Sequence, residues 1–473
     1  MVTGIREKRI VRVLDMTQGS PIKLILAFAV PLFIGNIFQQ VYSMVDTMVA
    51  GYNLGDNAIA AIGATSSLYG LIIDFAAGLN SGYTIVVTQR FGAHDPKKLK
   101  ASIAGMIELD AAVTVVLTVL SLIFLRPLMR FMNIPDAIFE QAYRYIAVIC
   151  AGMSATIAYN MFAGILRSFG NSRTSLFFLI ISSLLNMGMD FLFIVGLHLG
   201  VAGAALATVI AQTVSAVLCG VYVFRNYREL LPGREDFRIS SDLIAELFSN
   251  GIAMALMYCV VDLGSVIFQR ANNALAETII SAHTASRRIV NIMMQPLATI
   301  SNASSTFVGQ NWGAKKPERI RKALKQVLGM EIAWSLFGCA VIFAVGGMLV
   351  HFTTGTSDNR IIDYAVMSLR WHLLFFPALG CLLVLRTAMQ AMGRKTAPIL
   401  SSCIELGMKV LSAVFLIPRL GFFGTSITEP VTWTAMLLFL AAAFWNEKRN
   451  LFPSAAEYEK RRSITGQQVI VCK

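Results

Sequence analysis

Long apolar runs recur along the whole chain and are separated by short polar segments. A helix needs about 20 apolar residues to cross the ~30 Å hydrocarbon layer of a membrane, and most of these runs are longer. The pattern therefore predicts twelve membrane-spanning helices. We expect six in the first half, at 21–46, 57–90, 101–125, 139–166, 174–197 and 202–224. We expect the other six at 243–270, 277–311, 324–350, 362–390, 397–418 and 424–446.

The second half of the chain repeats the first. The second span is followed by QRFGAHDP and the eighth by QNWGAKKP, and the end of the first span returns in the seventh. The matched pairs there are Gly35 and Gly251, Tyr42 and Tyr258, Val45 and Val261, and Asp46 and Asp262. Transporters use parallel repeats of this kind to build a central cavity. The predicted fold is an all-α polytopic membrane protein in which two pseudo-symmetric six-helix bundles surround such a cavity.

Basic residues gather in alternate loops between the predicted spans. This bias places those loops, and with them both termini, in the cytoplasm. The expected organisation is a cytoplasmic segment 1–20, an N-lobe 21–224, a cytoplasmic linker 225–242, a C-lobe 243–446 and a cytoplasmic tail 447–473. The expected location is the cell membrane.

Composition narrows the class of function. The chain has 473 residues, of which 14% are charged, and a mean hydropathy of +0.65. Soluble proteins carry about 25% charged residues. The net charge of +13 resides in loops, so we expect no nucleic-acid partner. The sequence contains no P-loop, HExxH, GxSxG or dinucleotide-binding motif, and its seven cysteines lack metal-ligand spacing. We therefore expect neither an enzyme nor a resident cofactor or metal.

A few polar residues inside the spans could bind a cation. Asn186 and Asp190 lie four residues apart and so share one face of a helix, which Thr208 in the next span can approach. A carboxylate isolated in hydrocarbon is costly, so Asp190 needs a partner, a proton or a cation. With Asp46, these oxygens suit H⁺ or Na⁺. Pro31 should bend the first span. The alternatives are a hydrated Asp46, interhelical hydrogen bonds from Asn186 and Thr208, and a purely structural bend.

Over residues 15–447 the chain resembles the multidrug and toxic compound extrusion (MATE) antiporters. The resemblance rests on the first span ending in Asp46, on QRFGA, and on NMGMDFLF followed by GVAGAALATVIAQ. It implies the branch with archaeal and DNA-damage-inducible members, whose coupling-ion site falls on Asp46, Asn186, Asp190 and Thr208, with the gating kink at Pro31. It also implies export of drugs driven by H⁺ or Na⁺. The other branch uses C-lobe acids, and here the stretch 368–393, which holds most of the tenth span, has none.

Further polar residues are expected to line the cavity. They are Gln39, Tyr42, Asp74, Asp262, Arg287 and Arg386. The basic C-lobe residues would discourage cationic substrates unless Asp262, Glu405 and Glu429 neutralise them.

The expected partners are small organic substrates and the lipid bilayer, and we expect the protein to act as a monomer. The alternative functions are a flippase for lipids or lipid-linked oligosaccharides, an intramembrane enzyme and a channel. A flippase would favour a strongly cationic cavity and often has extra spans, whereas this chain has twelve predicted spans and the N-lobe acids.

Overall fold

The computed structural model describes residues 14–451, and every regular element in that range is helical. Residues 1–13 and 452–473, which hold most of the two expected terminal segments, lie outside the described range. The N-lobe comprises α1 (Pro21–Leu54), α2 (Asp56–Gly92), α3 (Pro96–Phe131), α4 (Asp136–Ala151), α5 (Met153–Ser168), α6 (Ser172–Asp190), η1 (Phe191–Gly196) and α7 (Val201–Asn226). The linker holds the short turns η2 (Arg228–Leu230) and η3 (Arg234–Phe237). The C-lobe comprises α8 (Ser241–Asn272), α9 (Glu277–Gly313), α10 (Pro317–Thr354), α11 (Asn359–Leu374), α12 (Phe376–Ala391), α13 (Thr396–Leu411), η4 (Ser412–Leu416), α14 (Ile417–Leu420) and α15 (Phe422–Leu451).

The helices agree with the apolar pattern. Within residues 14–451, nine helices are long and apolar enough to cross a membrane, and two bent pairs bring the number to eleven. Those pairs are α4 with α5, bent by 46°, and α11 with α12, bent by 47°. The remaining predicted span, 277–311, is α9, which is 37 residues long but carries His283, Arg287 and Arg288 in its first third and many hydroxyl and amide side chains after them. The predicted spans are therefore all helical.

The backbone repeats itself between the lobes. Residues with positive φ recur in pairs at matching turns: His94 and Lys315, Asn133 and Gly355, Gly170 and Gly393, Gly200 and Gly421. Each lobe also has one bent span and one π-helical turn, η1 or η4, at the same place in the order. π-Helical turns are rare and often mark functional sites. The duplication read from the sequence thus extends to backbone conformation.

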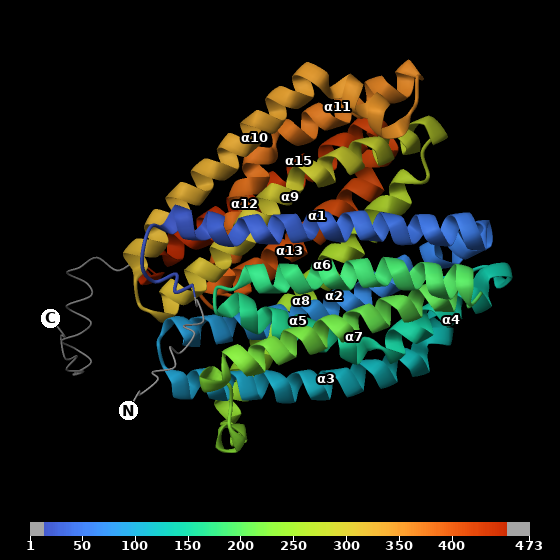
Figure 1. Cartoon of the computed structure of the whole chain (residues 1–473). Helices are drawn as coiled ribbons and strands as arrows, with labels where there is room; N and C mark the ends of the chain where they lie inside the picture. The colour runs from blue at the N-terminus through green and yellow to red at the C-terminus, as the bar shows by residue number, and fades with distance from the viewer. Residues whose placement is uncertain (1–13, 452–473) are drawn as a thin grey trace, which may run out of the picture.

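The two lobes meet at one end of the molecule and diverge toward the other (Figure 1). We call the meeting end the closed end; it holds the turns α2–α3 and α9–α10. Here Gly92 and Gly313 bring backbones together, because an added Cβ would lie 2.0 Å from the Gln310 oxygen and 1.8 Å from the Gln89 oxygen respectively. The lobes therefore touch through glycine positions that tolerate no side chain.

A symmetric pair of glutamines fastens the closed end. Gln89 Nε2 donates to the Ala391 carbonyl at 2.7 Å, and Gln310 Nε2 donates to the Ser168 carbonyl at 2.8 Å. Each bond runs from α2 or α9 of one lobe to the bent span of the other lobe. We call these two bonds the glutamine clasp. It explains why Gln and Gly recur together in QRFGA and QNWGA.

The segment just before α1 also crosses the closed end. Met16 is fully buried, and its backbone N–H donates to Gln310 Oε1 at 2.9 Å. Arg319 Nη2 and Asn311 Nδ2 each donate to the Met16 carbonyl at 3.0 Å. On the N-lobe side, Leu14 packs against Gly170. Residues 14–20 therefore bind both lobes.

Helix α1 links the lobes in a second way. Its first part, including Ile25 and Phe28, packs in one core cluster with α9, α10 and α12 of the C-lobe. Its later part packs against α6 of the N-lobe. Pro31 lies between these two parts, and α1 runs through it as one helix (Figure 1). Pro31 therefore does not interrupt α1 in this conformation.

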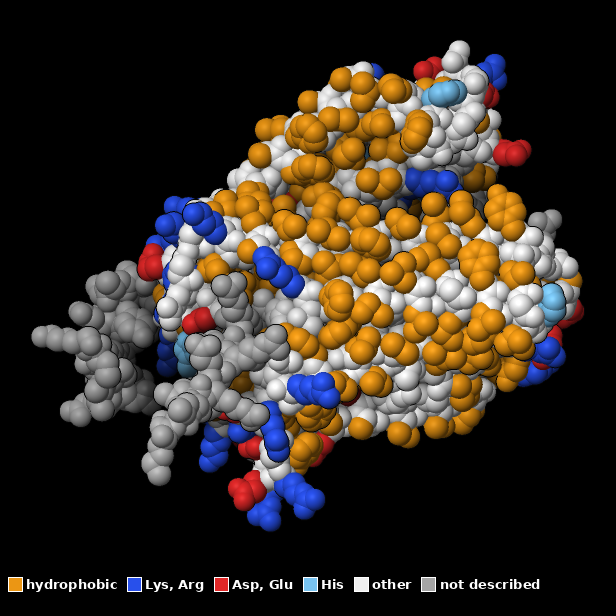
Figure 2. All heavy atoms as spheres, in the orientation of Figure 1, with side chains coloured by type: hydrophobic (Ala, Val, Ile, Leu, Met, Phe, Trp, Pro, Cys, Tyr) orange, Lys and Arg blue, Asp and Glu red, His pale blue; other side chains and the backbone are white. Residues whose placement is uncertain are grey.

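Hydrophobic and charged side chains are distributed over the surface as a lipid bilayer requires. Hydrophobic side chains cover the visible face of both lobes, and charged side chains gather toward the two ends (Figure 2). Many large apolar residues on this surface are exposed, among them Phe131, Met348 and Phe352. An apolar belt of this extent would be unstable in water but matches hydrocarbon.

Candidate functional site: a central cavity and two polar clusters

A cavity of about 570 Å³ lies between the lobes. Its walls come from α1, α2 and α5 on one side and from α8, α9 and α12 on the other. Apolar residues such as Phe28 and Met257 alternate with hydroxyl and amide groups such as Thr84 and Asn302. The volume and the mixed lining suit a small organic molecule.

Four charged residues line this cavity. Asp74 and Asp262 come from α2 and α8 of opposite lobes and lie close enough to interact directly. Arg167 and Arg386 lie on helices α5 and α12, which end at the closed end. The cavity is therefore not uniformly basic, because two acids balance two arginines.

A second polar cluster lies inside the N-lobe. Asp46 of α1 and Asp190 at the end of α6 are within hydrogen-bonding reach once one of them carries a proton. Asn186 lies one turn before Asp190. Asp190 is fully buried and Asn186 is 3% exposed. We call these three residues the N-lobe acid cluster.

Several buried polar atoms of the N-lobe acid cluster have no hydrogen-bond partner among the described residues, and one of them is the donor Asn186 Nδ2. Within the described part of the chain, no group donates to Asp46 Oδ1, to either Asp190 carboxylate oxygen or to Asn186 Oδ1. None of the basic side chains that the structure describes forms an ion pair with Asp46 or Asp190. Buried carboxylates in such a setting require a proton or a cation. The donor set fits either one.

Three tyrosines surround the acid cluster. Tyr42 of α1, Tyr69 of α2 and Tyr145 of α4 each lie near enough to Asp46 to interact with its charge. Tyr145 also packs beside Ile194 and Ala204. The sequence reasoning missed Tyr69 and Tyr145, since they come from helices that carry no acid of the cluster.

The other predicted site residues are placed differently. Thr208 lies on α7, and its hydroxyl donates to the Ala204 carbonyl of its own helix at 3.1 Å. Gln39 and Tyr42 interact with each other, and Tyr42 lies near Asp46; neither is among the residues that line the central cavity. Asp74, Asp262 and Arg386 do line it.

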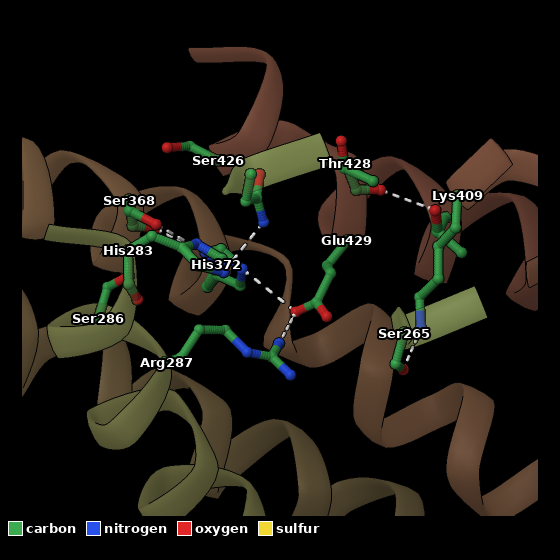
Figure 3. A network of polar contacts seen from close by, with 12 residues as sticks. Ser265, His283, Ser286, Arg287, Ser368, His372, Lys409, Ser426, Thr428 and Glu429 are labelled. Atoms are coloured by element: carbon green, nitrogen blue, oxygen red, sulfur yellow. Dashed lines mark hydrogen bonds and ion pairs between the residues drawn. The ribbon is translucent and has the colours of Figure 1, made fainter. Parts of the chain in front are cut away.

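Arg287, which was also expected at the cavity, lies in a third polar cluster. It donates to Glu429 of α15, whose Oε2 is 3.3 Å from His372 Nε2 (Figure 3). Lys409 Nζ of α13 donates to Glu405 Oε1 at 2.9 Å, and Glu405 Oε2 is 3.9 Å from Arg386. We call these six residues the C-lobe charge network: Arg287, His372, Arg386, Glu405, Lys409 and Glu429. Its three basic residues thus face two glutamates, and Asp262 of α8 adds a third carboxylate near Lys409.

The sequence reasoning also missed that two buried acids, Asp110 and Glu331, correspond to each other in the repeat. Asp110 of α3 accepts a hydrogen bond from Asn80 at 3.1 Å, and Glu331 of α10 accepts one from Ser301 at 3.2 Å. Both acids are almost fully buried. The two acids occupy matching positions after QRFGA and QNWGA, and their donors occupy matching positions before these motifs. Extending the repeat comparison into the third and ninth spans would have found the acids.

Comparison with known proteins decides the family. The MatE family model matches the chain twice, at residues 31–192 and 253–415, once in each lobe. Together these segments make up more than half of the chain. The chain belongs to the MatE family.

Relatives of this MatE protein include curated transporters and solved structures. The probable multidrug resistance protein YoeA of Bacillus subtilis (strain 168) is 24% identical over 89% of this chain and 94% of its own length. The DNA damage-inducible protein F of Escherichia coli (strain K12) is 24% identical over 89% of this chain and 92% of its own. A multidrug resistance MATE transporter in an outward-facing conformation has a TM-score of 0.86 at 21% identity, covering 94% of this chain and all of that one. The MatE chain described here is thus a multi-pass membrane protein of a transporter family.

Proposed function

We propose that this protein exports small organic compounds across the cell membrane in exchange for H⁺ or Na⁺. The observation that carries the proposal is the N-lobe acid cluster, whose buried oxygens receive no hydrogen bond from residues 14–451. A cation or proton bound between Asp46 and Asp190 would supply the positive charge that these buried carboxylates lack. The similarity to curated multidrug resistance proteins supports the substrate class.

The difference between the two ends of the molecule supports alternating access. The basic loops favour a cytoplasmic position for the closed end, where the glutamine clasp would seal the inner side while the lobes diverge outside. Substrate in the cavity would then leave to the exterior. Breaking the clasp and closing the outer ends would return the cavity to the cytoplasm.

Helix α1 is the element suited to couple the ion to this motion. Its first part belongs to a C-lobe core and its later part carries Asp46 into the N-lobe. Asn36 Nδ2 also donates to Thr299 Oγ1 of α9 at 3.2 Å. A change of charge at Asp46 would alter how α1 packs on α6, and Pro31 would let the two parts of the helix move separately.

The flippase alternative is less suitable. It expects a strongly cationic cavity, whereas Asp74 and Asp262 offset the two arginines that line this one. The polar groups on both walls are spread among apolar residues, which favours compact organic molecules of varied shape.

Export of a fluorescent dye from proteoliposomes tests the proposal. The purified protein is reconstituted, and ethidium movement is followed under a proton gradient alone, a sodium gradient alone and no gradient. We expect export driven by one of the two gradients, which names the coupling ion. Dye movement that is equally fast without any gradient would show that no ion is exchanged and would overturn the proposal.

A further inference from the structure

The C-lobe holds counterparts of the N-lobe residues proposed to bind the coupling ion. Asn186 follows the turn glycine Gly170 by sixteen residues, and Lys409 follows Gly393 by the same number. Thr208 and Glu429 each follow the turn glycines Gly200 and Gly421 by eight residues. All four glycines have positive φ. The repeat therefore places a lysine where the N-lobe has an amide.

The ammonium group of Lys409 occupies an acidic setting. It donates to Ser265 Oγ of α8 at 3.1 Å (Figure 3). It also donates to Glu405 at 2.9 Å, and its side chain is 5% exposed. It also interacts with the charges of Asp262, the counterpart of Asp46, and of Glu429. The Lys409 ammonium therefore lies near three carboxylates, two of which also face Arg287 or Arg386.

The charges of this region balance. Glu405, Glu429 and Asp262 face Lys409, Arg287 and Arg386, with His372 beside Glu429. The other charged groups that line the adjoining cavity are Asp74 and Arg167, one of each sign. Removing the Lys409 charge would leave one carboxylate without a partner. In the N-lobe acid cluster, by contrast, residues 14–451 supply no such cation.

We infer that Lys409 is a built-in substitute for the coupling cation, so that only the N-lobe exchanges an ion and one cation is coupled to each transport cycle. A tethered ammonium cannot leave, and it satisfies the same kind of buried oxygens that a mobile cation would satisfy. This assignment rests on the proposed function of the N-lobe acid cluster. It makes Lys409 a residue that sets the ion stoichiometry.

The number of cations bound per chain tests this inference. Equilibrium binding of radioactive Na⁺ and proton uptake reported by an indicator dye are measured on the purified full chain. We expect one exchangeable cation for the wild type, none for Asp190→Asn, two for Lys409→Asn and one for the double variant. Lys409→Arg, which keeps the charge, should bind one. Lys395→Asn removes a lysine outside the network and should also bind one.

The outcomes separate the two proposals. If Lys409→Asn binds one cation while Asp190→Asn binds none, the role of Lys409 is wrong and the N-lobe site stands. If Asp190→Asn still binds one and Lys409→Asn binds two, the N-lobe assignment is wrong and the role of Lys409 stands. Should Lys409→Asn fail to fold, Lys409→Gln removes the same charge with a side chain closer in length to lysine. We expect it to bind two cations as well, and a count of one would contradict the inference.

Discussion

The two lobes share a backbone plan but use their buried charges in opposite ways. In the N-lobe, Asp46 and Asp190 approach each other without a basic partner among the described residues. In the C-lobe, Glu429 and Glu405 are paired with arginine, histidine and lysine side chains. Duplication thus preserved the positions and changed the chemistry. The unpaired lobe is suited to exchange an ion, and the paired lobe to remain fixed.

Neutralising the matched acids Asp46 and Asp262 in turn tests this difference between the lobes most strongly. Asp46→Asn should weaken cation binding on the order of 100-fold, because losing a charged partner at a buried site costs about 3 kcal/mol. Asp262→Asn should leave the affinity within about threefold, since Asp262 lies by the cavity and Lys409. Titration with Na⁺ and with acid measures the cation affinity of both variants. Equal losses in the two variants would remove the distinction between the lobes.

The C-lobe charge network should govern stability. Glu429→Gln leaves Arg287 without its carboxylate, and we expect the free energy of unfolding to fall by about 3 kcal/mol. Glu140→Gln, at an exposed pair with Arg126, should cost less than about 1 kcal/mol. Denaturation in detergent, followed by tryptophan fluorescence, measures both variants. A Glu429→Gln protein as stable as the wild type would show that the network does not hold the C-lobe together.

The two bonds of the glutamine clasp should contribute about equally to closure, since each lobe supplies one of them. Gln89→Ala removes one hydrogen bond across the closed end and should destabilise that closure by about 1 kcal/mol. Gln310→Ala removes the matching bond and also the one from the Met16 N–H, so it should cost about 2 kcal/mol. A cysteine-reactive reagent applied from the cytoplasmic side to a Thr88→Cys reporter would measure how often the closed end opens. No effect of Gln89→Ala beside a large effect of Gln310→Ala would contradict the symmetric contact.

Pro31→Ala should have the smallest effect. Alanine restores the backbone N–H that proline lacks, so bending α1 would cost about 0.7 kcal/mol more and transport would slow about threefold. Dye export at saturating gradient measures the rate, and Pro127→Ala in α3 is the matched proline control. Equal rates in wild type and Pro31→Ala would exclude bending at this position as a slow step.

The sequence was a sufficient guide to much of this architecture. Apolar run lengths predicted helices that the structure contains, and repeated motifs located the turns where φ is positive in both lobes. Asp46, Asn186 and Asp190 could be chosen because polar groups in hydrocarbon are rare and expensive. Such arguments depend only on local pattern and on the properties of the membrane.

Other features depend on which helices become neighbours. Arg287 turns toward Glu429 because α9 packs against α11 and beside α15, which hydropathy does not reveal. Asp262 matches Asp46 in the repeat, yet it faces Asp74 of the other lobe because α8 crosses α2 at the centre. Tyr69 and Tyr145 reach Asp46 from separate helices. Tertiary contacts decide these roles.

The most direct test of the central claim is dye export by Asp190→Asn in proteoliposomes, with the wild type and Glu429→Gln alongside at equal amounts of folded protein. The account predicts that the coupling gradient drives no export by Asp190→Asn, while Glu429→Gln retains export that depends on the gradient. Gradient-driven export by Asp190→Asn at the wild-type rate would contradict the assignment of the coupling ion to the N-lobe.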